Sequence, residues 1–151
     1  MIHGVVIKKL NKYQDDRGWL SEVFRHDEHD YMPSMSYISV TKPGVVRGPH
    51  EHVYQWDCFV FVGPGTFEVY LWDRRNESDT HERHIKIEVG EESPTMIMVP
   101  PGVVHAYKCI SGYDAWCINM PNKLFKGIQK GDEAIDEIRW EERDDSPYKI
   151  D

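Results

Sequence analysis

The chain has 151 residues, of which 40% are hydrophobic and 29% are charged, and its formal net charge at pH 7 is −8. This length and composition predict a single globular domain, residues 1–151, with its own core. The negative charge argues against general nucleic-acid binding, which requires a basic surface. No apolar run approaches the roughly 18 residues of a membrane span, and the N-terminus lacks the basic-then-apolar order of a signal peptide. We therefore expect a cytoplasmic protein without a nucleic-acid or membrane partner.

About nine short β-rich runs follow one another at a spacing of roughly ten residues. They include, in chain order, residues 35–41, 57–62, 66–73, 83–89, 95–100, 104–110 and 114–120. Within them apolar and polar residues alternate, so that Phe67, Val69 and Leu71 share one face of their strand. Turn signals rich in Gly, Pro and Asn separate the runs. The pattern predicts an all-β antiparallel barrel or sandwich, followed by a short C-terminal helix within residues 131–142.

Three histidines and an acid stand where predicted strands begin or end. His50 and His52 have the same parity, so on a strand they point to one face and lie near enough to share an ion. Asp57 joins them only if the chain turns between residues 53 and 56 and Asp57 opens the next strand. His105 follows a Pro-Gly turn much later in the chain. Such a set suits a divalent ion such as Fe, Mn, Ni or Zn, and the alternative is a polar pocket without metal.

The cysteines show no metal-binding or disulfide pattern. Cys58, Cys109 and Cys117 form no CxxC pair, and each lies in an apolar run that favours a strand. Because their number is odd and the expected compartment is reducing, we expect three buried free thiols.

The spacing of the histidines resembles the two motifs of the cupin superfamily. The first motif is matched by Gly44, His50, His52 and Asp57, with Asp in place of the usual Glu. The second motif is matched by Pro100, Gly102 and His105. The resemblance implies a cupin-type antiparallel β-barrel, or jelly roll, with a catalytic metal site.

Longer stretches resemble the dTDP-4-dehydrorhamnose 3,5-epimerase family, which is itself a group of cupin-like barrels. The segment 15–25, "DDRGWLSEVFR", is similar to the family's opening D-x-R-G-x-x-x-E-x-F pattern. Further similarities lie in "RGPH", "DRRNESDT", the Pro-Gly turn before His105, and "IRWEE", which are residues 47–50, 73–80, 100–105 and 138–142. Together these motifs are more specific than the metal pattern and cover most of the chain.

The second resemblance implies a homodimeric enzyme that binds a nucleotide-linked 4-keto-6-deoxy sugar and requires no cofactor. His50 would be the base that removes the proton beside the keto group, and Glu142 would orient it. The expected substrate-binding residues are Arg17, Glu22, Arg47 and Gln55, with the two arginines suited to phosphate or oxygen atoms.

Two catalytic residues of this family have no counterpart of the same type here. The position of the lysine that stabilises the enolate corresponds to Cys58 or its neighbour Asp57. The position of the tyrosine that returns the proton corresponds to Cys117 or Ile118. One hypothesis is that a divalent cation polarises the keto oxygen in place of the lysine. Two alternatives are a metal-dependent dioxygenase or isomerase with another substrate, and a non-catalytic cupin that binds a sugar nucleotide.

Overall fold

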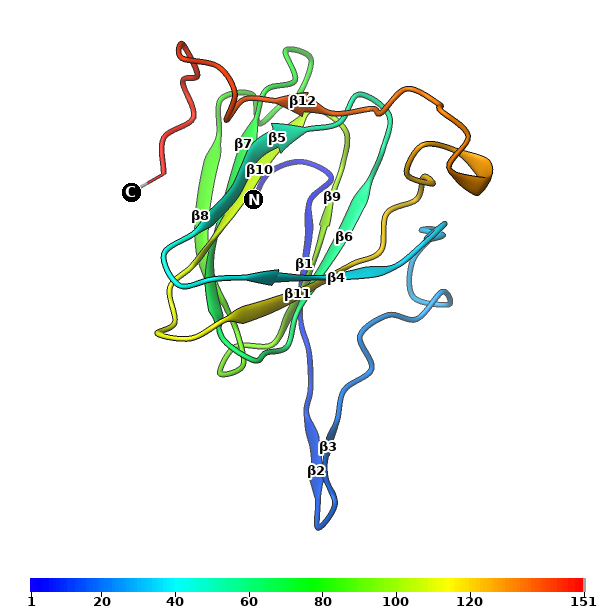
Figure 1. Ribbon diagram of the computed structural model, residues 1–151, viewed down its shortest axis with the longest axis vertical. Helices are drawn as coiled ribbons and strands as arrows, with labels where there is room; N and C mark the ends of the chain where they lie inside the picture. Colours follow the sequence, from blue (N-terminus) through cyan, green and yellow to red (C-terminus); the bar gives the residue numbers. More distant parts are fainter. Residues whose placement is uncertain (151) are drawn as a thin grey trace.

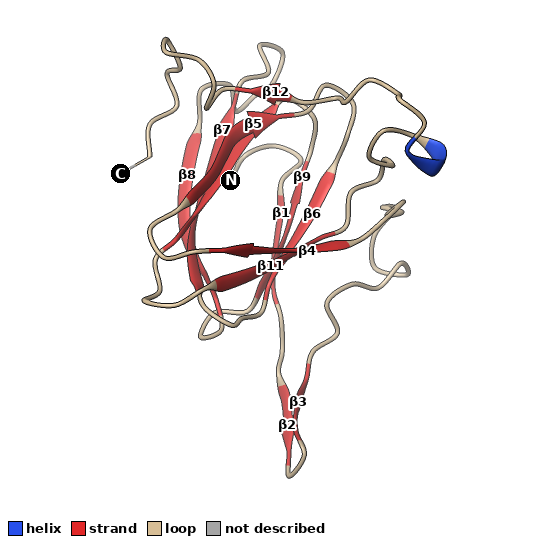
Figure 2. Ribbon diagram, in the orientation of Figure 1, coloured by secondary structure: helices blue, strands red, loops and turns tan. Residues whose placement is uncertain are grey.

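The computed structural model describes residues 1–150, which form two five-stranded antiparallel sheets and a small hairpin (Figures 1 and 2). The first sheet has the order β1 (Val6–Lys9), β9 (Thr95–Val99), β6 (Asp57–Phe61), β11 (Ala115–Asn119) and β4 (Tyr37–Thr41). The second has the order β12 (Ile138–Arg139), β5 (Val46–Glu51), β10 (Val103–Cys109), β7 (Thr66–Asp73) and β8 (His84–Gly90). No helix among the described residues is long and apolar enough to span a bilayer. The predicted antiparallel all-β architecture is therefore confirmed.

The core lies between the two sheets and contains the apolar face that the sequence predicted. Phe67, Val69 and Leu71 are at most 2% exposed and point inward from β7. The ring of Phe67 packs 5.2 Å from that of Phe61 on β6, so aromatic side chains join the two sheets at their centre. The alternate residues of β6, Cys58 and Val60, belong to a second apolar cluster on the other side of the first sheet. Strand alternation thus decides which residues of β6 face the space between the sheets.

The two sheets are joined at one end by the turn between β4 and β5. Arg47 on β5 donates from Nε to Thr41 Oγ1 at 2.9 Å and from Nη2 to the carbonyl of Val40 at 2.8 Å, both on β4. From this turn the two strands run in different directions, as Figure 1 shows. Their far ends, at Tyr37 and Glu51, are therefore free to form the walls of an opening.

The hairpin of β2 (Tyr13–Asp15) and β3 (Gly18–Leu20) projects away from the sheets (Figure 1). Its apolar side chains are in large part exposed: Tyr13, Trp19 and Leu20 at 56%, 49% and 62%. The hairpin therefore offers an apolar surface that this chain does not cover itself.

The prediction of a helix in residues 131–142 was wrong. The only helical turn among residues 1–150 is the 3₁₀ segment Ile128–Lys130, and the chain beyond it is irregular apart from β12, which pairs with β5. The carboxylate of Asp136 accepts hydrogen bonds of 2.7 Å from three successive backbone amides, at residues 53, 54 and 55. These tertiary contacts hold the segment open and override its local helical preference.

Candidate functional site

A cavity of about 1550 Å³ lies at the open end between the sheets. Its walls include strand residues of both sheets and the segment 121–137. His50, His52 and Asp57 all line it, and Asp57 is the first residue of β6, directly after the turn at residues 53–56. The sequence-based condition for Asp57 to meet the two histidines is therefore fulfilled.

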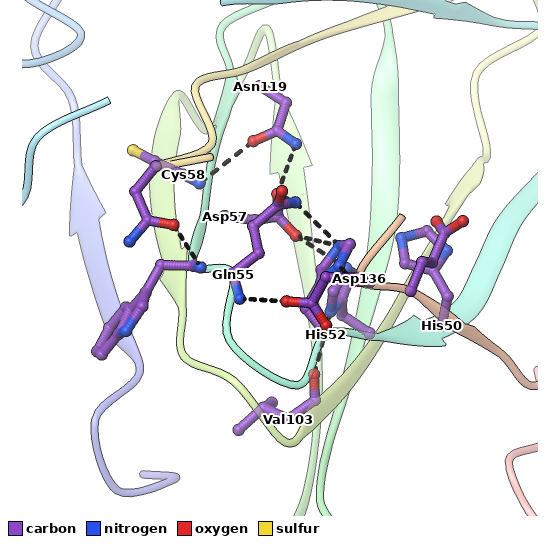
Figure 3. Close-up of polar contacts among 12 residues, drawn as sticks. His50, His52, Gln55, Asp57, Cys58, Val103, Asn119 and Asp136 are labelled. Carbon is purple, nitrogen blue, oxygen red and sulfur yellow. Dashed lines mark hydrogen bonds and ion pairs between the residues drawn. The ribbon is translucent and has the colours of Figure 1, made fainter. Parts of the chain in front are cut away.

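The carboxylate of Asp57 is the centre of the polar contacts in this cavity (Figure 3). Its Oδ2 atom lies 3.1 Å from Nε2 of His52 and 3.4 Å from Nε2 of His105. Its Oδ1 atom accepts hydrogen bonds from the side-chain amides of Gln55 at 3.0 Å and Asn119 at 2.9 Å. Asp57 is only 1% exposed, so these four neighbours provide its surroundings in place of water.

The contacts at Asp57 shift the protonation of the whole cluster. Burial favours the neutral acid, but the hydrogen bond with His52 and the charge of His105 outweigh it and lower the pKa of Asp57 to about 2. Burial also opposes a charge on His52, but Asp57 outweighs this and raises the pKa of His52 above its ordinary value. Burial, followed by repulsion from His50, lowers the pKa of His105 to about 3. These directions favour an ionised Asp57 beside a neutral His105, with His52 binding a proton more readily than a free imidazole does.

Backbone carbonyls fix the orientation of two of the imidazoles. Nδ1 of His52 donates to the carbonyl of Asp136, and Nδ1 of His105 donates to that of Val103 at 3.1 Å. Both rings consequently direct Nε2 toward Asp57. Nε2 of His105 is buried and has no hydrogen-bond partner among the described residues. The cluster therefore contains one nitrogen whose bonding capacity the protein leaves unused.

His50 has a different neighbour, the carboxylate of Glu141. Oε1 of Glu141 lies 3.9 Å from Nδ1 of His50 and comes from the residues just after β12. The backbone amides of Trp140 and Glu141 both donate to the carbonyl of Pro49, at 2.9 and 3.1 Å, which fastens this segment beside His50. Burial disfavours the charged form of Glu141, but the contact with His50 outweighs it and lowers the pKa of Glu141.

The acid beside His50 is thus not the residue that the sequence indicated. Glu142 has a side chain that is 66% exposed and lies 3.5 Å from Arg139, so it points away from His50. Glu141 and Glu142 lie in the turn that follows β12, and the pairing of Arg139 with His50 places Glu141 of this turn beside His50.

The four predicted metal ligands come together. Ligand atoms of His50, His52 and His105 all lie within 4.8 Å of one another, and Oδ2 of Asp57 stands beside two of them. His50 and His105 face each other across the pairing of β5 with β10, with ring centroids 4.4 Å apart. The geometry is compatible both with proton transfer by imidazole and with the coordination of an ion.

The four predicted substrate-binding residues divide into two pairs. Arg47 and Gln55 line the cavity. Arg17 lies on the projecting hairpin, where its 90%-exposed side chain pairs with Asp15, and Glu22 pairs with Arg25. Arg17 and Glu22 therefore lie outside the cavity of their own chain.

The structure also identifies the residues at the positions of the expected lysine and tyrosine. Asp57 lines the cavity, whereas Cys58 packs in the apolar cluster behind the sheet. Cys117 lies in the core and Ile118 packs on the other side, so neither lines the cavity. The residue of β11 that does is Asn119, which the sequence analysis missed although it shares the inward parity of Cys117.

Comparison with known proteins identifies the family. A profile of the dTDP-4-dehydrorhamnose 3,5-epimerase family matches residues 1–146. The chain belongs to this family. Among curated epimerase-family relatives, "probable low-salt glycan biosynthesis epimerase Agl13" of Haloferax volcanii is 36% identical over 137 residues, which cover 89% of this chain and 87% of the relative. Spore coat polysaccharide biosynthesis protein SpsL of Bacillus subtilis is 37% identical over 112 residues, 73% of each chain.

Solved structures of the epimerase family share the fold. The dTDP-4-dehydrorhamnose 3,5-epimerase of Sulfolobus tokodaii aligns with a TM-score of 0.70 and 26% identity, over 79% of this chain and 70% of that one. ChmJ, a 3′-monoepimerase from Streptomyces bikiniensis in complex with dTDP-quinovose, aligns with a TM-score of 0.78 and 22% identity, over 91% and 70%. These structures confirm the barrel inferred from the sequence resemblance.

We predict that Asp57→Asn changes the acid stability of the protein. The folded-state pKa of Asp57 lies below its unfolded value, so its contribution to the free energy of unfolding is present above about pH 4 and lost as the pH falls toward 2. At pH 5, with a chelator present, the free energy of unfolding from thermal melts should be on the order of 2 kcal/mol higher for the wild type than for the variant. The difference should shrink between pH 4 and 2. A difference that stays constant over this range would show that Asp57 is not ionised with a lowered pKa.

Proposed function

We propose that this protein is a sugar-nucleotide epimerase or isomerase that acts on a dTDP-linked 4-keto-6-deoxy sugar. Family membership supports the substrate class, and the pair formed by His50 and Glu141 at the cavity wall carries the chemical argument. An imidazole with a carboxylate at Nδ1 has its other nitrogen available as a base, and the carboxylate stabilises the imidazolium that forms.

The reaction begins at a carbon next to the C4 carbonyl. His50 takes the proton from this carbon, and the electrons of the C–H bond form an enolate whose negative charge rests on the C4 oxygen. Return of a proton to the carbon restores the carbonyl, and the configuration depends on the face from which that proton comes. An enolate needs a nearby donor or positive charge.

The charge of the cavity must support this enolate despite the buried acid. Asp57 alone would repel an enolate, because both groups are negative in a region with little water. A proton on His52, 3.1 Å from Asp57, would balance the carboxylate. Arg47 adds a permanent positive charge to the lining of the cavity. The proposal therefore requires no cofactor.

The unused nitrogen of His105 favours a second candidate, in which a divalent metal is bound by His50, His52, Asp57 and His105. Two ligands that each lie about 2.1 Å from a tetrahedral ion are roughly 3.4 Å apart, close to the separations at Asp57 Oδ2 of 3.1 and 3.4 Å. Such an ion would polarise the keto oxygen of a substrate. His50 would then be a ligand and not a free base.

We also propose that two chains associate and that the protein acts in the cytoplasm. Dimerisation is supported by the projecting hairpin, whose exposed Trp19 and Leu20 need a surface to cover them. In such a dimer, Arg17 and Glu22 of one chain would lie at the cavity of the other chain. A reducing compartment is supported by three buried cysteines that form no disulfide.

His50→Gln should lower the turnover of dTDP-4-keto-6-deoxyglucose by about 10²- to 10⁴-fold, because the variant lacks the imidazole that takes the proton in the proposed reaction. Turnover is measured as deuterium uptake from D₂O at C3 and C5 by proton NMR. His84→Gln, on the outer side of the second sheet against Trp72, is the matched control and should keep the wild-type rate. Wild-type uptake in the His50 variant would refute the proposed base.

Metal content separates the two candidates. If the metal candidate is correct, elemental analysis of untagged protein should find about one divalent ion per chain, and His105→Ala should lose it. The epimerase without a cofactor should instead contain far less than one ion per chain and keep its activity after chelation.

A further inference from the structure

Tyr37 is the one tyrosine at the cavity whose hydroxyl is joined to the Asp57 cluster. It is the first residue of β4, the edge strand of the first sheet, and lies opposite Asn119 in the pairing of β4 with β11. Its side chain lines the cavity and is partly open to it, at 44% exposure. Nδ2 of Asn119 donates to its hydroxyl oxygen at 3.0 Å.

The orientation of the Asn119 amide determines the role of the Tyr37 hydroxyl. Oδ1 of Asn119 accepts from the backbone amide of Cys58 at 3.2 Å, so Nδ2 is the donor toward both Asp57 and Tyr37. Tyr37 is therefore the acceptor in its contact with Asn119. The hydroxyl proton of Tyr37 has no acceptor among the described residues, so it can be donated to a molecule bound in the cavity. Partial burial raises the pKa of Tyr37, which keeps the phenol protonated at neutral pH.

The topology places Tyr37 and His50 on different walls. His50 is the second-to-last residue of β5 in the second sheet, whereas Tyr37 is the first residue of β4 in the first. The two strands diverge from the turn at residues 42–45, so these two residues lie at their open ends (Figure 1). A sugar ring between the sheets would have the base on one side and the phenol on the other. Inversion at a carbon needs this arrangement, because a proton returned from the base's own side restores the starting configuration.

The other tyrosines at the cavity are less suited to the role. The hydroxyl of Tyr107 is paired with Ser39 at 3.2 Å, and its side chain is 5% exposed within the core. Tyr54 is 69% exposed on the turn after β5, with the ammonium of Lys123 5.4 Å from its ring. Neither hydroxyl is in contact with the Asp57 cluster.

We propose that Tyr37 is the acid that returns the proton to carbon on the face opposite His50, a role that rests on the proposed function. In this step the enolate carbon takes the phenol proton, the C4 carbonyl re-forms, and the phenolate regains a proton from solvent. His50 releases the proton it took to solvent, so no redox partner is required. Asn119 donates to the phenolate while it exists and is its positioning residue.

The test follows exchange and inversion separately in Tyr37→Phe. The enzyme is incubated with dTDP-4-keto-6-deoxyglucose in D₂O, deuterium at C3 and C5 is read by NMR, and the epimers are separated after borohydride reduction. The variant should form epimer at least about 100-fold more slowly than wild type. It should still exchange deuterium with retained configuration, because His50 can return a deuteron to its own face. Tyr113→Phe is the matched control and should do both at the wild-type rate, because the hydroxyl of Tyr113 bonds to Glu91 away from the cavity.

The remaining outcomes each decide the matter. Epimer formation at the wild-type rate in Tyr37→Phe would overturn the assignment. Equal loss of exchange and inversion in a variant that melts like wild type would also overturn it, because Tyr37 would then not act specifically in proton return. If wild-type protein exchanges no deuterium, the proposed function itself fails and this assignment fails with it.

Discussion

The constraint on which the cavity depends is the buried negative charge of Asp57. A carboxylate that is 1% exposed is strongly unfavourable unless polar partners replace its water. Here those partners come from two distant parts of the chain: Asn119 from β11, and His52 and Gln55 from the segment that follows β5. A single charge thereby ties together parts of the chain that are distant in sequence.

The same charge divides the polar groups of the cavity into two sets. Asp57 contacts His52, whereas His50 lies beside Glu141, so the proposed base is separate from the group that balances the buried acid. Asp57 also accepts a hydrogen bond from Asn119, whose same nitrogen donates to the hydroxyl of Tyr37 and makes that hydroxyl an acceptor. The loss of the lysine and tyrosine typical of the resemblance is thus not the loss of an organised site. Asp57 stands at the position of the lysine, and with Asn119 it forms a different network that would serve the two requirements of the proposed reaction, a base and a facing acid.

Much of the fold could be predicted from local pattern. Alternation located β4 and the strands from β6 to β11, but not β5, which Gly48 and Pro49 interrupt. The turn before Asp57 correctly required that residue to open a strand. The short elements β1, β2, β3 and β12 were missed, because two to four residues carry little periodic signal. Glu141, Asn119 and Tyr37 could not be assigned because their positions depend on the pairing of β12 with β5 and of β4 with β11. Register between distant strands is set by packing and not by the local sequence.

The protonation of His52 tests the central claim, that a proton on this residue balances Asp57 and leaves His50 free as the base. It can be measured at pH 6 by two-bond proton–nitrogen correlation NMR on protein with ¹⁵N-labelled histidine, after chelation and again after one equivalent of Zn²⁺. We predict that both nitrogens of His52 are protonated and that Zn²⁺ does not change this. An unprotonated Nε2 on His52 that shifts together with His50 and His105 when Zn²⁺ is added would contradict it and establish the metal site.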